Sequence, residues 1–121
     1  MRRLLKTGMM GENLLSASRK YIDEDCFSHF HDFYEIEYVI AGGGSCTVNG
    51  REEPLEAGML FFLTPIDCHS VCTAGAELFN VMFSERLVDF ALLEPFLRYG
   101  SGRTIAVAPS VRPFLEQLLT E

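Results

Sequence analysis

The sequence predicts a mainly β domain, folded as a barrel or sandwich of short strands. Between residues 20 and 84, short runs of apolar and β-branched residues alternate with Gly, Pro and Asn, which is typical of strands joined by tight turns. Asn49-Gly50 is a strong hairpin signal, because a type I′ turn places two successive residues at positive φ. Residues 59–63 are apolar on both faces, as expected of a strand that is covered on both sides.

The first part of the chain is predicted to be a loosely ordered segment followed by the opening strands. Residues 1–19 show no clear hydrophobic period, as expected of a loosely ordered N-terminus, and the family resemblance described below implies that they form an N-terminal arm. The barrel is expected to span residues 20–84, with a β pattern from Tyr21 onward. Residues 35–40 alternate as a half-buried strand does, and residues 42–44, three glycines, are expected to form a hairpin loop.

The remaining strands of the expected barrel follow the same pattern. Residues 45–48 precede the Asn-Gly turn, and residues 51–55 form the returning strand. Pro54 marks the edge or the end of that strand, because proline cannot donate a ladder hydrogen bond. Residues 69–72 and 77–83 supply two further strands.

Residues 85–121 are expected to form a helical extension. Ser84 is a suitable N-cap for a helix over residues 85–93, and residues 103–108 are expected to add one strand. Ser110 is a suitable cap for a final helix in which apolar residues recur at helical spacing. This apolar stripe consists of Val111, Phe114, Leu115, Leu118 and Leu119. It exceeds what so short a helix needs unless the helix packs on another surface.

Residue types that bind metal ions gather in one predicted strand. His29, His31 and Glu35 have odd numbers, so an unbroken extended strand would place their side chains on one face. His69 follows a turn-like stretch, and a barrel would bring it beside the first three residues. Three imidazoles and one carboxylate suit a divalent transition metal such as Zn, Ni, Mn or Fe. These four residues are therefore the candidate metal ligands.

The same four residues also fit a pocket that binds an organic molecule without a metal. Ligand pockets combine apolar walls with a few polar groups, and Tyr38 and Phe61 are candidate aromatic walls. A third interpretation is structural, with the polar side chains hydrogen-bonded to one another in the barrel mouth. Glu37 also has an odd number and could approach Glu35 as one of two paired carboxylates, but it is expected to face solvent or to pair with a basic residue.

Composition limits the classes of partner. The chain has 17 acidic and 10 basic residues and a formal charge of −7, which disfavours contact between this chain and DNA phosphates. No apolar run reaches the roughly 20 residues that a membrane helix needs, so we expect a cytoplasmic protein without membrane contact. The four cysteines form no Cys-x-x-Cys pair and are expected to stay reduced.

Two stretches of the sequence resemble a known superfamily. His29-x-His31-x-x-x-Glu35, followed by Gly42, resembles the first motif of the cupins, and residues 58–69 resemble a shortened second motif. The stretches HFHDFYEIEYVIAGGGSCTVNG, LEAGMLFFLTPIDCHS and ELFNVMFS are similar to one branch in particular. That branch is the N-terminal sensory domain of AraC-type transcriptional regulators.

The resemblance implies a cupin-like double-stranded β-helix, a jelly-roll barrel, followed by short C-terminal helices. It also implies an effector-sensing and dimerisation domain that binds a small molecule, for example a sugar, with its arm packed near the pocket. Such a domain forms a homodimer, requires no metal, and reaches DNA only through a C-terminal helix-turn-helix domain outside this chain.

Two departures from the cupin motifs favour the interpretation without metal. Asp23 stands where the first motif opens with a glycine, and Asp67 stands in the region of the second motif's internal glycine. The alternative function is that of a stand-alone, metal-dependent cupin enzyme of the dioxygenase or isomerase class.

Overall fold

The computed structural model describes the backbone of residues 2–4, 13–87, 89, 91, 94 and 104–120. Within these ranges, the side chains of residues 2–4, 26–31, 105 and 118–120 lie outside the description. The described part of the chain is mainly β, as predicted from the sequence. In chain order its elements are β1 (Arg2–Leu4), β2 (Leu15–Ile22), β3 (Cys26–His31), β4 (Tyr34–Ala41), β5 (Ser45–Val48), β6 (Arg51–Pro54), β7 (Met59–Leu63), β8 (His69–Cys72), β9 (Ala76–Phe83), the 3₁₀ helix η1 (Glu85–Leu87), β10 (Thr104–Ala106) and α3 (Arg112–Thr120).

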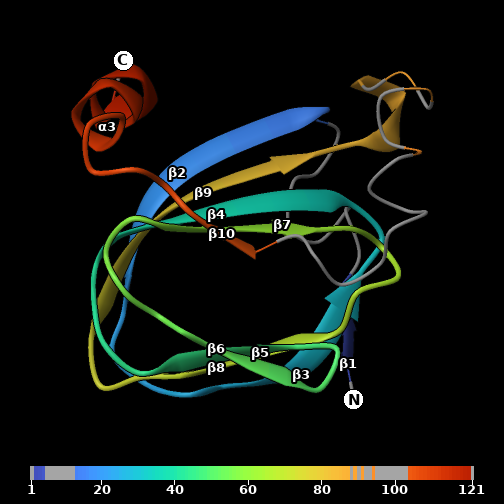
Figure 1. Ribbon diagram of the computed structural model, residues 1–121. Coiled ribbons are helices and arrows are strands. Elements are labelled where there is room, and N and C mark those ends of the chain that lie inside the picture. Colours follow the sequence, from blue (N-terminus) through green and yellow to red (C-terminus); the bar gives the residue numbers. More distant parts are fainter. Residues whose placement is uncertain are drawn as a thin grey trace.

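Two five-stranded sheets face each other around a shared interior (Figure 1). The first, called the β4 sheet, has the order β10-β7-β4-β9-β2, and the second, called the β8 sheet, has the order β1-β3-β8-β5-β6. From β4 to β9 the chain passes from one sheet to the other several times, and the described strand pairs are antiparallel apart from the parallel pair of β1 and β3. This is the jelly-roll arrangement that was predicted.

The segment that was expected to be a single strand from residue 29 to residue 40 is two strands. β3 ends at His31 and β4 begins at Tyr34, and the two strands belong to different sheets. Residues 32–33 form a bend between them. The odd-number parity cannot be carried through such a bend, because side-chain alternation holds only within one extended strand. The prediction that one strand holds His29, His31 and Glu35 on one face is therefore wrong.

The triple glycine also differs from the expected hairpin loop. It joins β4 to β5, which lie in opposite sheets, so it is a crossover between the two layers. Gly44 has a φ of +102°, and a Cβ built on it would lie 2.1 Å from the carbonyl oxygen of Cys72. A Cβ built on Gly43 would meet no atom within 4 Å. Gly44 therefore requires glycine, whereas Gly43 does not.

The Asn49-Gly50 hairpin between β5 and β6 is confirmed. Asn49 has a φ of 52° and Gly50 a φ of 83°, as a type I′ turn requires. The Asn49 side chain also ties this turn to the loop before β8, since its Nδ2 donates to Asp67 Oδ1 (2.7 Å) and its Oδ1 accepts from the Cys68 amide (2.9 Å). Pro54 ends β6 at the edge of the β8 sheet, as expected.

The β structure begins earlier in the chain than residue 20. β1 pairs with β3, and β2 pairs with β9 from Leu15 onward, so β1 and the first part of β2 lie within the segment expected to be an arm. Most side chains of β2 are exposed because this strand forms the edge of the β4 sheet. An edge strand exposed in this way leaves no alternation of apolar and polar residues for sequence analysis to detect.

Of the C-terminal elements, β10 joins the edge of the β4 sheet and α3 lies on the outer side of that sheet (Figure 1). Ser84 accepts a hydrogen bond at Oγ from the Arg86 amide (3.2 Å), but the turn it caps is the 3₁₀ helix η1. Most of the predicted helix over residues 85–93 lies outside the described residues. The strand expected within residues 103–108 is β10, which pairs with β7, and the expected final helix is α3. None of the helices in the described part of the chain has the length and apolar character needed to cross a bilayer.

Apolar side chains fill the interior at the end of the barrel where β4 finishes. This core consists of Val39, Cys46, Leu55, Phe61, Val71, Ala76 and Leu78, which come from both sheets. Phe33 and Met82 form a separate apolar contact. Polar side chains point into the interior between the apolar core and the Phe33–Met82 contact.

The crossover loop yields a prediction about stability. We expect Gly44→Ala to lower the free energy of unfolding by about 2 kcal/mol or more, because alanine is strained at this φ and its methyl group would clash with backbone. Gly43→Ala is the matched control and should change stability by less than about 1 kcal/mol. Urea unfolding of both variants measures the difference, and equal stabilities would contradict the account of this loop.

Candidate functional site

Two glutamates lie side by side on the inner face of β4. Glu35 and Glu37 are buried, and they share this face with Val39 because alternate residues of a strand point the same way. The register partners of Glu37 are Phe61 on β7 and Asn80 on β9. The inner face of the β4 sheet therefore changes from apolar at Val39 to acidic at Glu37.

Asn80 holds the two carboxyl groups from the neighbouring strand. Its Nδ2 donates to Glu35 Oε1 and, at 3.4 Å, to Glu37 Oε1. Asn80 is 1% exposed and Glu37 is 3% exposed, so no bulk water compensates these groups. Among the described residues, Glu37 Oε2 and Asn80 Oδ1 have no hydrogen-bond partner. A buried acceptor left in this state costs roughly 1–3 kcal/mol of folding free energy.

His69 reaches the same place from the β8 sheet. Ligand atoms of Glu35, Glu37 and His69 all lie within 4.8 Å of one another, and His69 is buried. The loop before β8 fixes the position of His69, because Asp67 Oδ2 accepts hydrogen bonds from the Thr64 amide (2.8 Å) and hydroxyl (2.9 Å). A polar cluster of Glu35, Glu37, His69 and Asn80 thus spans the space between the two sheets.

Burial dominates the electrostatics of the polar cluster. It raises the pKa of Glu37 well above its ordinary value, and the charge of Glu35 and the hydrogen bond between the two carboxyl groups raise that pKa further. The charge of Lys20 lowers the pKa of Glu37 as the smallest contribution. The pair therefore retains a proton to higher pH than two solvated carboxylates do.

The thiol of Cys46 on β5 responds to the same environment. Burial, followed by the charges of Glu37, Glu35 and Glu53, raises the pKa of Cys46 to about 12. A thiol with this pKa is protonated at physiological pH and is a poor nucleophile. The interior therefore offers hydrogen-bond acceptors and two acids, but its described cysteine is not suited to covalent catalysis.

The structure brings together two of the six predicted site residues in this cluster, Glu35 and His69. Tyr38 lies on the opposite face of β4, where its hydroxyl donates to Glu116 Oε1 of α3 (3.1 Å). Tyr38 therefore lies apart from the polar cluster, because even-numbered residues of β4 face away from Glu35 and Glu37, and its part in ligand binding stays a prediction. Phe61 does lie inside, next to Glu37, as a fully buried core residue.

The remaining two predicted ligands are His29 and His31. Their backbones lie in β3, and His29 is the register partner of His69 on β8. Their side chains lie outside the part of the chain that the structure describes. Their membership of the site stays a prediction from the sequence.

Sequence analysis missed two residues of the polar cluster, Glu37 and Asn80. Glu37 was expected to face solvent or a basic residue, but it is buried beside another acid. Its odd number, shared with Glu35, was the signal for the inner face. Asn80 is a single polar residue between the apolar residues Leu78 and Met82 on the buried face of β9, and that pattern could have identified it.

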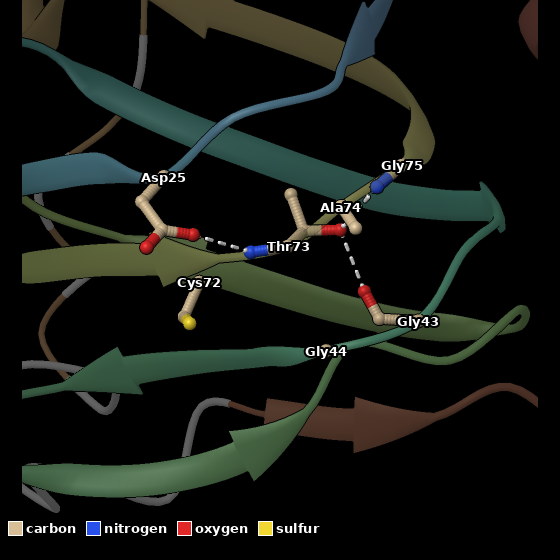
Figure 2. A pocket seen from close by; sticks show the side chains of 7 residues that line it. All are labelled: Asp25, Gly43, Gly44, Cys72, Thr73, Ala74 and Gly75. Atoms are coloured by element: carbon tan, nitrogen blue, oxygen red, sulfur yellow. Dashed lines mark hydrogen bonds between the residues drawn. The ribbon is translucent and has the colours of Figure 1, made fainter.

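A hollow opens away from the polar cluster, beside the crossover loop. It has a volume of about 520 Å³ and is lined by Asp25, Gly43, Gly44, Cys72, Thr73, Ala74 and Gly75 (Figure 2). The Asp25 carboxylate accepts from the Thr73 amide (3.0 Å), and the Thr73 hydroxyl donates to the Gly43 carbonyl (2.7 Å). A hydrogen bond with Asp25, followed by its charge, raises the pKa of the Cys72 thiol. These polar groups bond to one another, which leaves them less available to a ligand.

Comparison with known proteins places the chain among sequence and structural relatives. The family profile of the AraC-like ligand binding domain matches residues 14–121. None of the curated proteins matches the chain at a significant level.

Solved structures of cupins resemble the fold. A cupin protein from Bacteroides fragilis has a TM-score of 0.56 and 17% identity, with 69% of this chain and 76% of that chain covered. An RmlC-like cupin from Shewanella frigidimarina has a TM-score of 0.52 and 29% identity, with 61% and 71% covered. A predicted oxalate decarboxylase from Thermotoga maritima has a TM-score of 0.54 and 26% identity, with 67% and 75% covered. These likenesses confirm the cupin fold that the motifs predicted.

Proposed function

The chain belongs to the family of AraC-like ligand-binding domains, and we propose that it is the effector-sensing domain of an AraC-type transcriptional regulator. The observation that carries this proposal is the polar cluster around Glu37, which adjoins the apolar core inside the barrel. Buried acceptors without donors reduce stability, which favours a binding role over a purely structural one. Pockets for small molecules are built in this way, with apolar walls around a few polar groups.

Strand β4 connects the polar cluster to the outer helix. Its inner face carries Glu37, and its outer face carries Tyr38, which is hydrogen-bonded to Glu116 of α3. An effector that contacts Glu37 favours one arrangement of β4 and α3 over another and so shifts the population between the two states. In the intact regulator, this shift in population changes the position of the DNA-binding half relative to the sensory domain.

The DNA-binding half lies outside this chain in our proposal. The chain itself carries a formal charge of −7, which disfavours contact with the phosphate backbone. DNA is contacted by a C-terminal helix-turn-helix domain, and the regulator works in the cytoplasm. The effector is a small molecule, and a sugar is one candidate class.

Capture of the effector tests this function. We expect purified protein, incubated with the small-molecule fraction of a cell extract and then washed, to retain a compound that mass spectrometry identifies after denaturation. At one hundred times its Kd, that compound should stabilise the fold by about 2.7 kcal/mol. The control is Glu37→Gln, which should retain less of it. If no compound is enriched on the wild-type protein over this variant, the sensory function is contradicted.

A metal-dependent cupin enzyme is the second candidate, favoured by the short distances within the polar cluster. Glu35, Glu37 and His69 offer ligand atoms within 4.8 Å of one another, and carboxylates with an imidazole suit Mn, Fe, Ni or Zn. In this candidate function Glu35 and His69 hold the ion, and His29 and His31 from β3 complete the set predicted from the sequence. A bound ion would supply Lewis-acid chemistry to a substrate oxygen.

Elemental analysis decides between the two candidates. A metal enzyme should bind one ion per chain after incubation with Zn, Ni, Mn and Fe salts, and His69→Ala should reduce the metal content to background. Because a ligand imidazole must be neutral, affinity should fall as the pH drops below about 6.5. Protein that stays free of metal after all four incubations contradicts the enzyme and leaves the sensory domain in place.

The outer helix favours a homodimer. α3 faces the barrel with polar residues, since Glu116 bonds to Tyr38 and Arg112 lies against Gly58. Two of the three described residues of its apolar stripe are left exposed instead, with Phe114 74% exposed and Val111 50% exposed, while Leu115 is half-buried. We propose that this part of α3 contacts the same helix of a second copy. Leu118 and Leu119 belong to the predicted stripe, but their side chains lie outside the described residues.

Light scattering over a range of concentrations tests the dimer. We expect Phe114→Ser to weaken dimerisation at least tenfold, because it removes the largest exposed apolar side chain of α3. Ile66→Ser is the matched control, since Ile66 is equally exposed at 75% but lies in the loop before β8. A wild-type protein that remains monomeric at high concentration contradicts the proposal.

A further inference from the structure

Two buried acceptor atoms point to the chemistry of the effector. Among the described residues, Glu37 Oε2 and Asn80 Oδ1 have no hydrogen-bond donor, although both residues are almost fully buried. They come from neighbouring strands, and Glu37 and Asn80 are register partners. Partners of this kind project from the same face of the sheet, so the two acceptors belong to one site.

The orientation of the Asn80 amide is fixed by its surroundings. Its Nδ2 donates to Glu35 Oε1 and to Glu37 Oε1, which turns Oδ1 away from the two carboxyl groups. The opposite orientation would place the amide oxygen against carboxylate oxygens and leave the Nδ2 donor without these bonds. Asn80 therefore presents an acceptor, and not a donor, to whatever fills the site.

The described groups that face Glu37 supply no nearby permanent positive charge. Glu35 on β4 is acidic, His69 on β8 lies within 4.8 Å, and Cys46 on β5 carries a thiol. Lys20 on the edge strand β2 influences Glu37 through its charge, but its own side chain is exposed. The site thus combines two carboxyl groups and an amide oxygen in a place that is closed to bulk water.

We infer that this site recognises a primary ammonium group on the effector, held by Glu37, Asn80 and Glu35. This inference rests on the proposed sensory function and names the class of its ligand. An ammonium group has three donors, no acceptor and a positive charge, so it complements acceptors that are partly anionic. Its nitrogen bonds to oxygens about 2.7–2.9 Å away, so it can bridge the carboxyl groups of Glu35 and Glu37, whose oxygens lie within 4.8 Å of each other. A hydroxyl group has one donor and no charge, and it complements the site less well.

Methylammonium is a probe small enough to test the site without knowledge of the effector. We expect methylammonium chloride to shift the side-chain amide signals of Asn80 in ¹H–¹⁵N NMR spectra, with saturation and a Kd on the order of 10 mM, as the ligand-efficiency limit for so small a molecule allows. Tetramethylammonium chloride has the same charge but no N–H donor, and methanol has a donor but no charge. Neither should give a saturable shift of the Asn80 signals.

Two variants locate the binding on the cluster. Glu37→Gln keeps the shape of the side chain, and we expect it to raise the Kd for methylammonium at least tenfold. Glu52→Gln removes one exposed carboxylate on β6 and should leave the Kd unchanged. The titrations of the wild-type protein decide the matter even if Glu37→Gln folds poorly.

Several results would overturn the inference. They are the lack of a saturable methylammonium shift in the wild type, an equal response to tetramethylammonium or methanol, or a Kd that Glu37→Gln leaves unchanged. If the protein binds a divalent metal but does not bind methylammonium, the cluster is a metal site, as in the metal-dependent cupin enzyme proposed above. An effector captured from extract that has no amino group would end this inference while the sensory function stood. A saturable methylammonium shift without any captured effector would support an ammonium-binding site at the cluster and contradict the sensory function.

Discussion

Two carboxyl groups placed side by side in the interior of a small barrel constrain the rest of the structure. Removing an ionised carboxylate from water is costly unless neighbouring groups compensate it. Here Asn80 donates to both Glu35 and Glu37, the two acids are hydrogen-bonded to each other, and burial keeps the pKa of Glu37 high. Each of these effects depends on the register of β4 with β9. A slip of one residue would turn the acids outward and bring Tyr38 inside.

The two faces of β4 have different roles: the inner face carries the polar cluster, and the outer face contacts α3. The inner face changes from Glu35 and Glu37 to Val39, so the polar cluster ends against the apolar core. The outer face carries an aromatic cluster, in which Tyr34 stacks on Phe83 with ring centroids 5.4 Å apart. Farther along the same face, Tyr38 bonds to α3. Because both faces belong to one strand, a displacement of β4 caused by contacts at its inner face also changes the position of Tyr38 relative to α3.

The departure of the second cupin motif from its usual glycine has a structural explanation. Asp67 stands in that region, where its carboxylate bonds to Thr64 on one side and to the Asn49 side chain on the other. This buried network ties the loop before β8 to the β5–β6 hairpin and so fixes the start of the strand that carries His69. Asp67 therefore acts on His69 through the backbone, and its presence is compatible with a working site.

The sequence by itself determined the features that depend on neighbouring residues. The Asn49-Gly50 turn follows from backbone preference, the alternation in β9 follows from half-burial of one strand, and the motifs identified the cupin barrel. Tertiary structure alone decided which side chains meet, because sheet order and bends depend on contacts between distant segments. The bend at residues 32–33 separated His31 from Glu35, and the pairing of β4 with β9 brought Asn80 to Glu37 across 43 positions of sequence. Side-chain parity is a local property, whereas the polar cluster depends on three strands in two sheets.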